Sequence, residues 1–220
     1  ELFRSVKAGN GRVEIALTDG GTLSAAQVND LSVAGTANCY VVSAPGTYVF
    51  NARVRGNGAG EGVGFEPAIE MADGMTADWL WTDSEGLVSG VALDTTSGDI
   101  FLTVGEGRGN ALVALMQDGK VVWSWHVWVT DAPQTMTYGN GTVFMDRNLG
   151  AVGTTAGGTD AYGMYYQWGR KDPFYGGEKT ETSANAFLEA KNGTVVNPAY
   201  PALDLSLIHI SEPTRQEAIS

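Results

Sequence analysis

Two long apolar runs, separated by only two residues, constrain this chain more than any other feature. The first run covers residues 111–117, the second covers residues 120–130, and Asp118-Gly119 lies between them. Tryptophan and valine recur at every second position from 121 to 129. A two-residue Asp-Gly connection is typical of a type I′ turn, which requires positive φ at both positions. The pattern therefore predicts a long antiparallel β-hairpin at the centre of the fold.

Shorter runs with the character of β-strands precede this hairpin. In each of them, apolar residues alternate with other residues or form a short block bounded by turn residues. Gly is common, at 30 residues, and aromatic residues make up 10% of the chain, as is typical of strands joined by tight turns. The strands predicted in this way are residues 12–17, 39–42, 48–54, 78–82, 87–93 and 100–104. Their spacing predicts a mostly β chain with an antiparallel, Ig-like β-sandwich.

The character of the sequence changes after Pro133. Residues 136–147 predict two short strands around Gly139-Asn-Gly141, and residues 175–204 are polar and irregular. We therefore predict a domain boundary near residues 131–135. The predicted division is an incoming segment of a preceding module (1–34), the β-sandwich domain (35–132) and a second, truncated domain (133–204).

The last sixteen residues, 205–220, have a different origin in our interpretation. Residues 205–215 read LSLIHISEPTR, which is without mismatch the translation of a transposase-type sequencing adapter. We expect this segment to be adapter read-through that does not belong to the native protein, and we exclude it from the fold. His209 is then not native. The net charge of the remaining chain is −11 instead of −12, because the tail carries one Arg and two Glu.

Charge and cysteine content exclude several partners and stabilising bonds. The net charge is −12, so nucleic acids and anionic membrane surfaces would repel the chain. Cys39 is the one cysteine, so no intrachain disulfide can form. No apolar run approaches the ~20 residues that span a bilayer, and a signal peptide would lie upstream of Glu1. We expect membrane attachment only through an anchor outside this chain.

The sequence contains no recognisable reactive centre. With one native histidine, His126, and one cysteine, Cys39, it has no His/Cys cluster at zinc-ligand spacing. No G-x-S-x-G motif supplies a nucleophile for His126, and the Gly-rich loop at residues 56–64 lacks a phosphate-binding pattern. We therefore predict that the chain is not an enzyme and that it holds no cofactor or metal.

Strand parity divides the tryptophans of residues 120–130 between two faces. Trp123 and Trp125 share a face with the valines, which predicts a core face. His126 lies on the opposite face with Ser124 and Trp128, and we interpret it as a structural histidine. Tryptophans on such a strand can also bind sugar rings. Core packing is the favoured interpretation, and it leaves Trp128 as the one tryptophan of this strand that could be exposed.

Three stretches resemble bacterial surface proteins of the fimbrillin and fimbrial-tip type. They are residues 35–48, residues 109–131 and the motif Met145-Asp-Arg-Asn-Leu-Gly-Ala151. The last stretch, together with residues 162–174 (YGMYYQWGRKDPF), resembles the start of a C-type-lectin-like domain of the "major paralogous" surface class. The resemblance implies an incomplete α+β lectin-like domain after the sandwich. It also implies an adhesion protein, secreted or anchored as a lipoprotein, at the cell surface or outer membrane.

Charged and aromatic residues of the second segment are the candidate ligand-binding residues. Arg and Asp beside Tyr and Trp can hydrogen-bond sugar hydroxyls next to a stacking platform. They can equally form internal ion pairs that pin the loops, and this structural role is favoured for Asp146-Arg147 and for Arg170-Lys-Asp172. The candidate residues are Tyr165, Tyr166, Trp168, Arg170 and Asp172.

The leading functional hypothesis is a non-catalytic adhesion or fimbrial-tip component. Its partners would be a host or microbial glycan or protein, and other fimbrial subunits. Two alternatives stay open: a glycan-capture module of a polysaccharide-uptake system, and an ancillary domain of an extracellular hydrolase. Degradative enzymes encoded nearby would favour the first alternative, and a catalytic domain downstream would favour the second.

Overall fold

The strands predicted within the described residues are present in the structure. The computed structural model describes residues 28–59, 66–166, 171–173 and 189–190, and within them the chain is mostly β. The one helical element of these residues is a 3₁₀ turn, η1 (Thr159–Ala161). The strands are β1 (Val28–Asp30), β2 (Cys39–Val42), β3 (Gly46–Asn51), β4 (Thr76–Thr82), β5 (Val88–Asp94), β6 (Asp99–Val104), β7 (Gly109–Gln117), β8 (Lys120–Val129), β9 (Thr135–Thr137), β10 (Val143–Met145) and β11 (Glu189–Ala190). The strand predicted at residues 12–17 and the tail at 205–220 lie outside the described residues.

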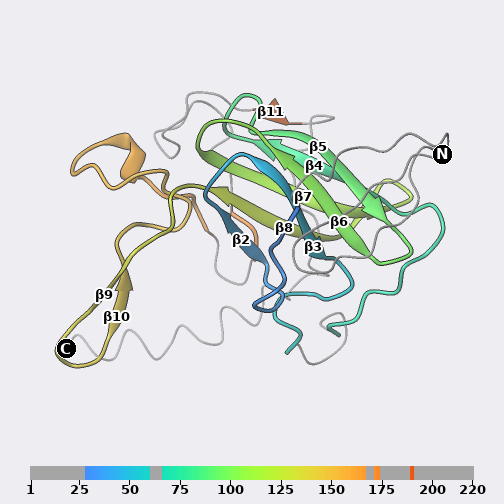
Figure 1. Cartoon of the computed structure of the whole chain (residues 1–220), viewed down its shortest axis with the longest axis horizontal. Helices are drawn as coiled ribbons and strands as arrows, with labels where there is room; N and C mark the ends of the chain where they lie inside the picture. The colour runs from blue at the N-terminus through green and yellow to red at the C-terminus, as the bar shows by residue number, and fades with distance from the viewer. Residues whose placement is uncertain (1–27, 60–65, 167–170, 174–188, 191–220) are drawn as a thin grey trace, which may run out of the picture.

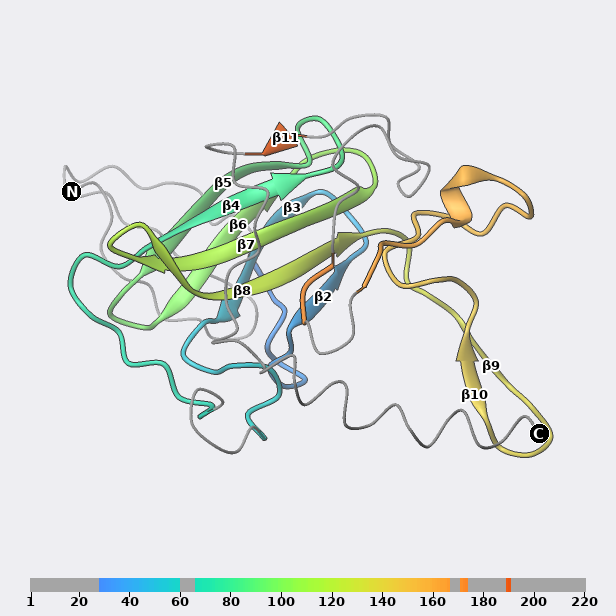
Figure 2. The same cartoon turned by 180° about the vertical axis from the view of Figure 1, so that it is seen from behind.

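Two main sheets pack face to face in a sandwich-like arrangement (Figures 1 and 2). One has the strand order β1-β3-β6-β5 and the other has the order β11-β4-β7-β8-β2. Most neighbouring strands are antiparallel, but β1 pairs with β3, and β2 with β8, in parallel. The antiparallel arrangement predicted for the sandwich of residues 35–132 is therefore wrong at the β2–β8 pair, while β1 lies outside that range. The cause is that β2 and β3, separated only by residues 43–45, enter different sheets instead of forming a hairpin.

The predicted central hairpin is the β7–β8 pair. Asp118 has a φ of 52° and Gly119 a φ of 73°, as a type I′ turn requires. The ladder runs from the pair Gln117–Lys120 beside the turn to the pair Gly109–Val129 at the far end. This hairpin forms the middle of the larger sheet.

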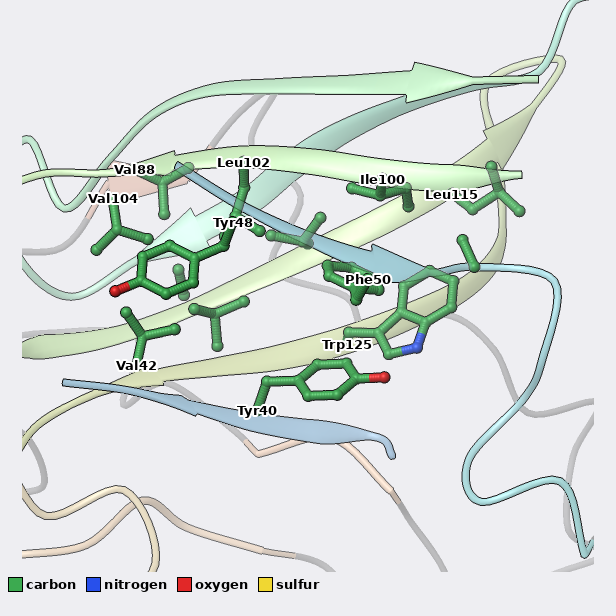
Figure 3. Close-up of a cluster of buried hydrophobic side chains, with 14 of the residues drawn as sticks. Tyr40, Val42, Tyr48, Phe50, Val88, Ile100, Leu102, Val104, Leu115 and Trp125 are labelled. Atoms are coloured by element: carbon green, nitrogen blue, oxygen red, sulfur yellow. The ribbon is translucent and has the colours of Figure 1, made fainter. Parts of the chain in front are cut away.

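The main core lies between the two sheets. Trp125 of β8 is fully buried, and its ring centroid lies 5.1 Å from that of Phe50 of β3, which is 5.1 Å from that of Tyr40 of β2. Trp123 also lies in this core, which confirms the predicted core face of β8. Figure 3 shows Trp125, Phe50 and Tyr40 converging from both sheets with Val42, Tyr48, Val88, Ile100, Leu102, Val104 and Leu115.

The opposite face of β8 is buried as well, and this corrects one prediction. Trp128 is 2% exposed, and its Nε1–H donates to the Ala151 carbonyl at 3.0 Å. Residues 148–152 cover this face, and Gly150 allows their close approach: its φ is +84°, and a Cβ there would collide with Met164. The sequence could not show this cover because strand parity defines two faces but not what packs on each. The boundary predicted near residues 131–135 thus divides segments that share a buried interface.

The β9–β10 hairpin projects from the body of the molecule (Figures 1 and 2). It confirms the two short strands predicted on either side of Gly139-Asn-Gly141. The Tyr138 amide donates to the Thr142 carbonyl, and the Asp146 amide donates to the Gln134 carbonyl, both at 2.9 Å. We call residues 134–146 the arm. The arm ends at Asp146. Residues 148–152, which cover the outer face of β8, follow it almost directly in the chain.

Candidate functional site

A buried polar network fixes residues 148–152 on the outer face of β7 and β8. Asn110 of β7 is its centre, since its side-chain amide donates to Asp83 Oδ2 and to the Gly150 carbonyl, both at 2.9 Å. Asp83 also accepts the Asn110 backbone N–H at 2.5 Å. Asp83, Asn110 and His126 are all buried. Polar groups removed from water in this way require hydrogen-bond partners, which the network supplies.

The same network defines the protonation of His126. Because the amide nitrogen of Asn110 donates to Asp83 and Gly150, the Asn110 Oδ1 faces His126 and lies 2.9 Å from its Nε2. Nε2 therefore carries the proton and donates it to Oδ1. His126 Nδ1 is then an acceptor, and it lies 3.3 Å from the Cys39 Sγ. The parallel β2–β8 register places Cys39 directly opposite His126.

Cys39, His126 and Asn110 have the connectivity of a Cys-His-Asn hydrolase site. Sequence reasoning missed this arrangement because the three residues lie on three strands that only the sheet pairing brings together. Burial lowers the pKa of His126 to about 4, and desolvation raises the pKa of the Cys39 thiol to about 12. Cys39 is an exposed residue, although its Sγ contacts His126 Nδ1. At neutral pH both groups are uncharged, whereas a nucleophilic cysteine needs a thiolate.

We expect Cys39 to react slowly with iodoacetamide in the folded chain. At pH 7.5 the rate should be about a hundredfold or more below that of an ordinary thiol with a pKa near 8.5, because alkylation requires the thiolate. Mass spectrometry of timed samples would measure the rate between pH 5 and 10. The urea-unfolded chain is the control, and it should react at the ordinary rate. A fast rate that stays constant from pH 5 to 8 would reveal a thiolate–imidazolium pair and contradict the neutral assignment.

A second buried cluster holds residues 171–173 against β8. Asp172, a predicted ligand-binding residue, is 2% exposed, accepts the Ser124 hydroxyl at 2.5 Å and pairs with Lys171. The Lys171 ammonium also donates to the Ser124 carbonyl at 2.6 Å and lies 4.9 Å from the centroid of the Trp123 ring. The Asp172 carboxylate thus faces inward, where it holds residues 171–173 against β8.

Tyr165 and Tyr166, two further predicted ligand-binding residues, lie at the surface. They are 60% and 42% exposed. The residue before them, Met164, is buried against β4 and β7, and its amide donates to the Leu149 carbonyl at 2.9 Å. The chain is therefore anchored at Met164 before the two tyrosines and again at residues 171–172 after them. Trp168 and Arg170 lie outside the described residues.

An open groove of about 540 Å³ lies beside the root of the arm. One wall consists of residues 144–149 and the other of residues 153–157 with Ala161. Phe144 and Leu149 give it exposed apolar surface, and Asn148 adds an exposed amide. Apolar walls with a few polar groups are typical of ligand sites. Sequence reasoning missed the groove because its walls are placed by tertiary packing and carry no motif.

Arg147 lies in the groove wall, but its guanidinium is fully engaged. It forms paired hydrogen bonds with Asp146 (2.8 and 3.0 Å) and with Asp131 (3.1 and 2.9 Å), and it donates to the Thr130 hydroxyl at 2.9 Å. The Arg147 side chain is 2% exposed. Its hydrogen bonds lower the pKa of Asp131 to about 2 and also lower the pKa of Asp146. This geometry agrees with the structural role favoured for Asp146-Arg147.

Metal ligation and membrane spanning have no structural support in the described part of the chain. No group of three or more His, Cys, Asp and Glu side chains is placed there to hold a metal ion. No helix of these residues has the length and apolarity needed to cross a bilayer.

No protein-family model and no curated protein matches the sequence. The features of the described residues that bear on function are the exposed tyrosines, the groove and the neutral Cys39–His126 pair.

Proposed function

We propose that this chain is a non-catalytic adhesion module of a bacterial cell surface that binds carbohydrate at Tyr165 and Tyr166. The observation that carries the proposal is that two exposed aromatic residues follow a buried anchor at Met164 and precede a second anchor at residues 171–172. A sugar ring stacks its C–H face on an exposed aromatic ring. Anchoring the chain on both sides reduces the conformational entropy that binding would otherwise remove.

Charge favours a neutral ligand for this surface. The chain carries a net charge of −12, which repels anionic ligands. In the neighbouring groove, Arg147 is matched by the carboxylates of Asp131 and Asp146, so no cation is left to attract an anion. Hydroxyl groups of a neutral sugar can still bond to Asn148 and to the exposed Thr154 and Thr155. A neutral glycan is therefore the ligand class that we propose.

The Cys39–His126 pair supports the part of the proposal that says the chain is non-catalytic. The raised pKa of the Cys39 thiol and the lowered pKa of His126 leave both groups uncharged at neutral pH. The proposal also includes the finer architecture, in which an Ig-like sandwich carries the start of a lectin-like domain in a fimbrial-tip component. Surface display would depend on an anchor outside this chain.

Binding to a glycan array, followed by calorimetric titration of the best neutral glycan, would test the proposal. Tyr165→Ala and Tyr166→Ala are each expected to weaken binding by about tenfold, because each removes a stacking ring. Tyr165→Phe keeps the ring and should bind as the unmodified chain does. Binding that survives both alanine substitutions but is lost in Phe144→Ala would move the site to the groove and contradict the tyrosine assignment. Failure of every neutral glycan to bind would contradict the ligand class.

A further inference from the structure

The arm exposes an uncharged, apolar surface on a strongly acidic protein. Residues 135–145 contain no Asp, Glu, Lys or Arg, whereas the whole chain has a net charge of −12. Five large apolar side chains of the arm are between 40% and 56% exposed: Met136, Tyr138, Val143, Phe144 and Met145. Tyr138 and Phe144 pack edge to face, with centroids 5.4 Å apart. An isolated two-stranded hairpin with this much exposed apolar surface is typical of an interaction element.

The arm also presents unpaired strand edges. Its sheet has the order β10-β9, so in the described part of the chain neither strand has a second neighbour. The bonds Tyr138–Thr142 and Asp146–Gln134 show which residues direct their backbone groups toward the partner strand. By alternation, the backbone N–H and C=O groups of Val143 and Met145 point outward from β10, and those of Thr135 and Thr137 point outward from β9. Such an edge is a template for another strand.

We propose that the arm is a self-association element in which β10 pairs antiparallel with β10 of a second copy of this chain. The two hairpins then form a four-stranded sheet across a two-fold axis at Phe144. Val143 of one copy lies opposite Met145 of the other, and each such pair exchanges two backbone hydrogen bonds. The β10 edge is favoured over the β9 edge because its outward residues, Val143 and Met145, are apolar, whereas those of β9 are two threonines.

The β10 edge identifies a second copy as the occupant, because antiparallel pairing about Phe144 sets one apolar residue, Val143, opposite another, Met145. Two copies of a chain with a net charge of −12 repel one another, and the arm offers contact without any charged residue between positions 135 and 145. In the antiparallel arrangement, the uncharged tip of one arm lies beside the root of the other, and the bodies lie at opposite ends. A strand of about five residues spans ~17 Å, which exceeds the Debye length of ~8 Å at physiological salt. An oppositely charged partner would find no charge to bind between positions 135 and 145.

Sedimentation velocity of the full chain at roughly 10 to 500 µM would test the proposal, because an interface of this size is at the weak end of the range. We expect a concentration-dependent dimer that increases when salt screens the repulsion between the bodies. Met145→Pro removes an outward N–H of β10 and should abolish the dimer. Thr135→Pro is the matched control, since it removes the outward N–H of the residue paired with Met145 but on the β9 edge, and it should leave the dimer intact.

Three outcomes would overturn the proposal. They are a monomer at all concentrations and salt levels, a dimer that persists in Met145→Pro, and equal loss of the dimer in both proline variants. Circular dichroism confirms that each variant is folded, and Met145→Thr separates loss of the side chain from loss of the N–H. The measurement contains no glycan, so its result is independent of the proposed carbohydrate binding. A strand from another protein as the true partner would give the first of these outcomes.

Discussion

Asn110→Ala is expected to destabilise the folded chain by about 3–5 kcal/mol, because it removes the centre of a buried polar network. The substitution deletes the hydrogen bonds to Asp83 Oδ2, to the Gly150 carbonyl and to His126 Nε2. It leaves a buried carboxylate and a buried imidazole with fewer partners, and it releases the segment that covers the outer face of β8. Urea unfolding followed by tryptophan fluorescence would measure the change in the free energy of unfolding.

The matched control for this substitution is Asn148→Ala. Asn148 is exposed, and its amide makes one hydrogen bond, to the Ala161 carbonyl at 3.1 Å. We expect this change to cost about 1 kcal/mol or less. Similar losses for the two variants would show that the Asn110 network does not hold the outer cover, and the structural account of residues 148–152 would then be wrong.

Stability is expected to fall by about 3 kcal/mol as the pH decreases from 6.5 to 4, because the folded chain holds His126 in its neutral form. Burial lowers the pKa of His126 from 6.5 to about 4. Between these values the unfolded chain binds more protons than the folded chain, so the free energy of unfolding rises with pH. The contribution is fully present above pH 6.5 and is lost as the pH falls toward 4. The pKa of Asp131 is about 2, so this carboxylate changes the free energy of unfolding only at a lower pH than His126 does.

His126→Gln would isolate this effect. Gln can still donate to Asn110 Oδ1 but does not titrate, so the pH dependence between 6.5 and 4 should become flatter in this variant. Urea unfolding at several pH values measures it for both chains, and His126→Gln retains His209. An NMR titration of the His126 ring in the unmodified chain provides a second measurement that does not require the variant to fold. A His126 pKa near 6.5 would contradict the assignment.

The sequence alone determined the inner core and most of the strands, whereas β1 and β11 were not predicted. The alternation of Trp123, Trp125 and the valines of β8 specifies which face is buried between the sheets, because the side chains of a strand alternate strictly between two faces. Asp118-Gly119 specifies the central hairpin, because few other residue pairs adopt positive φ twice in succession. The arm strands follow from a different turn, since of the loop residues Gly139-Asn-Gly141 only Gly141 has a positive φ, of 84°.

Only the tertiary structure decided what covers the outer face of β8 and which polar side chains are buried there. The burial of Trp128, the Asp83–Asn110–His126–Cys39 network and the inward-facing Asp172 carboxylate all depend on contacts between segments far apart in the chain. Local periodicity contains no information about such contacts, because it reports how one strand divides its side chains and not which segment returns to pack on them. The parallel pairing of β2 with β8 could not be predicted for the same reason, because it also joins segments far apart in the chain.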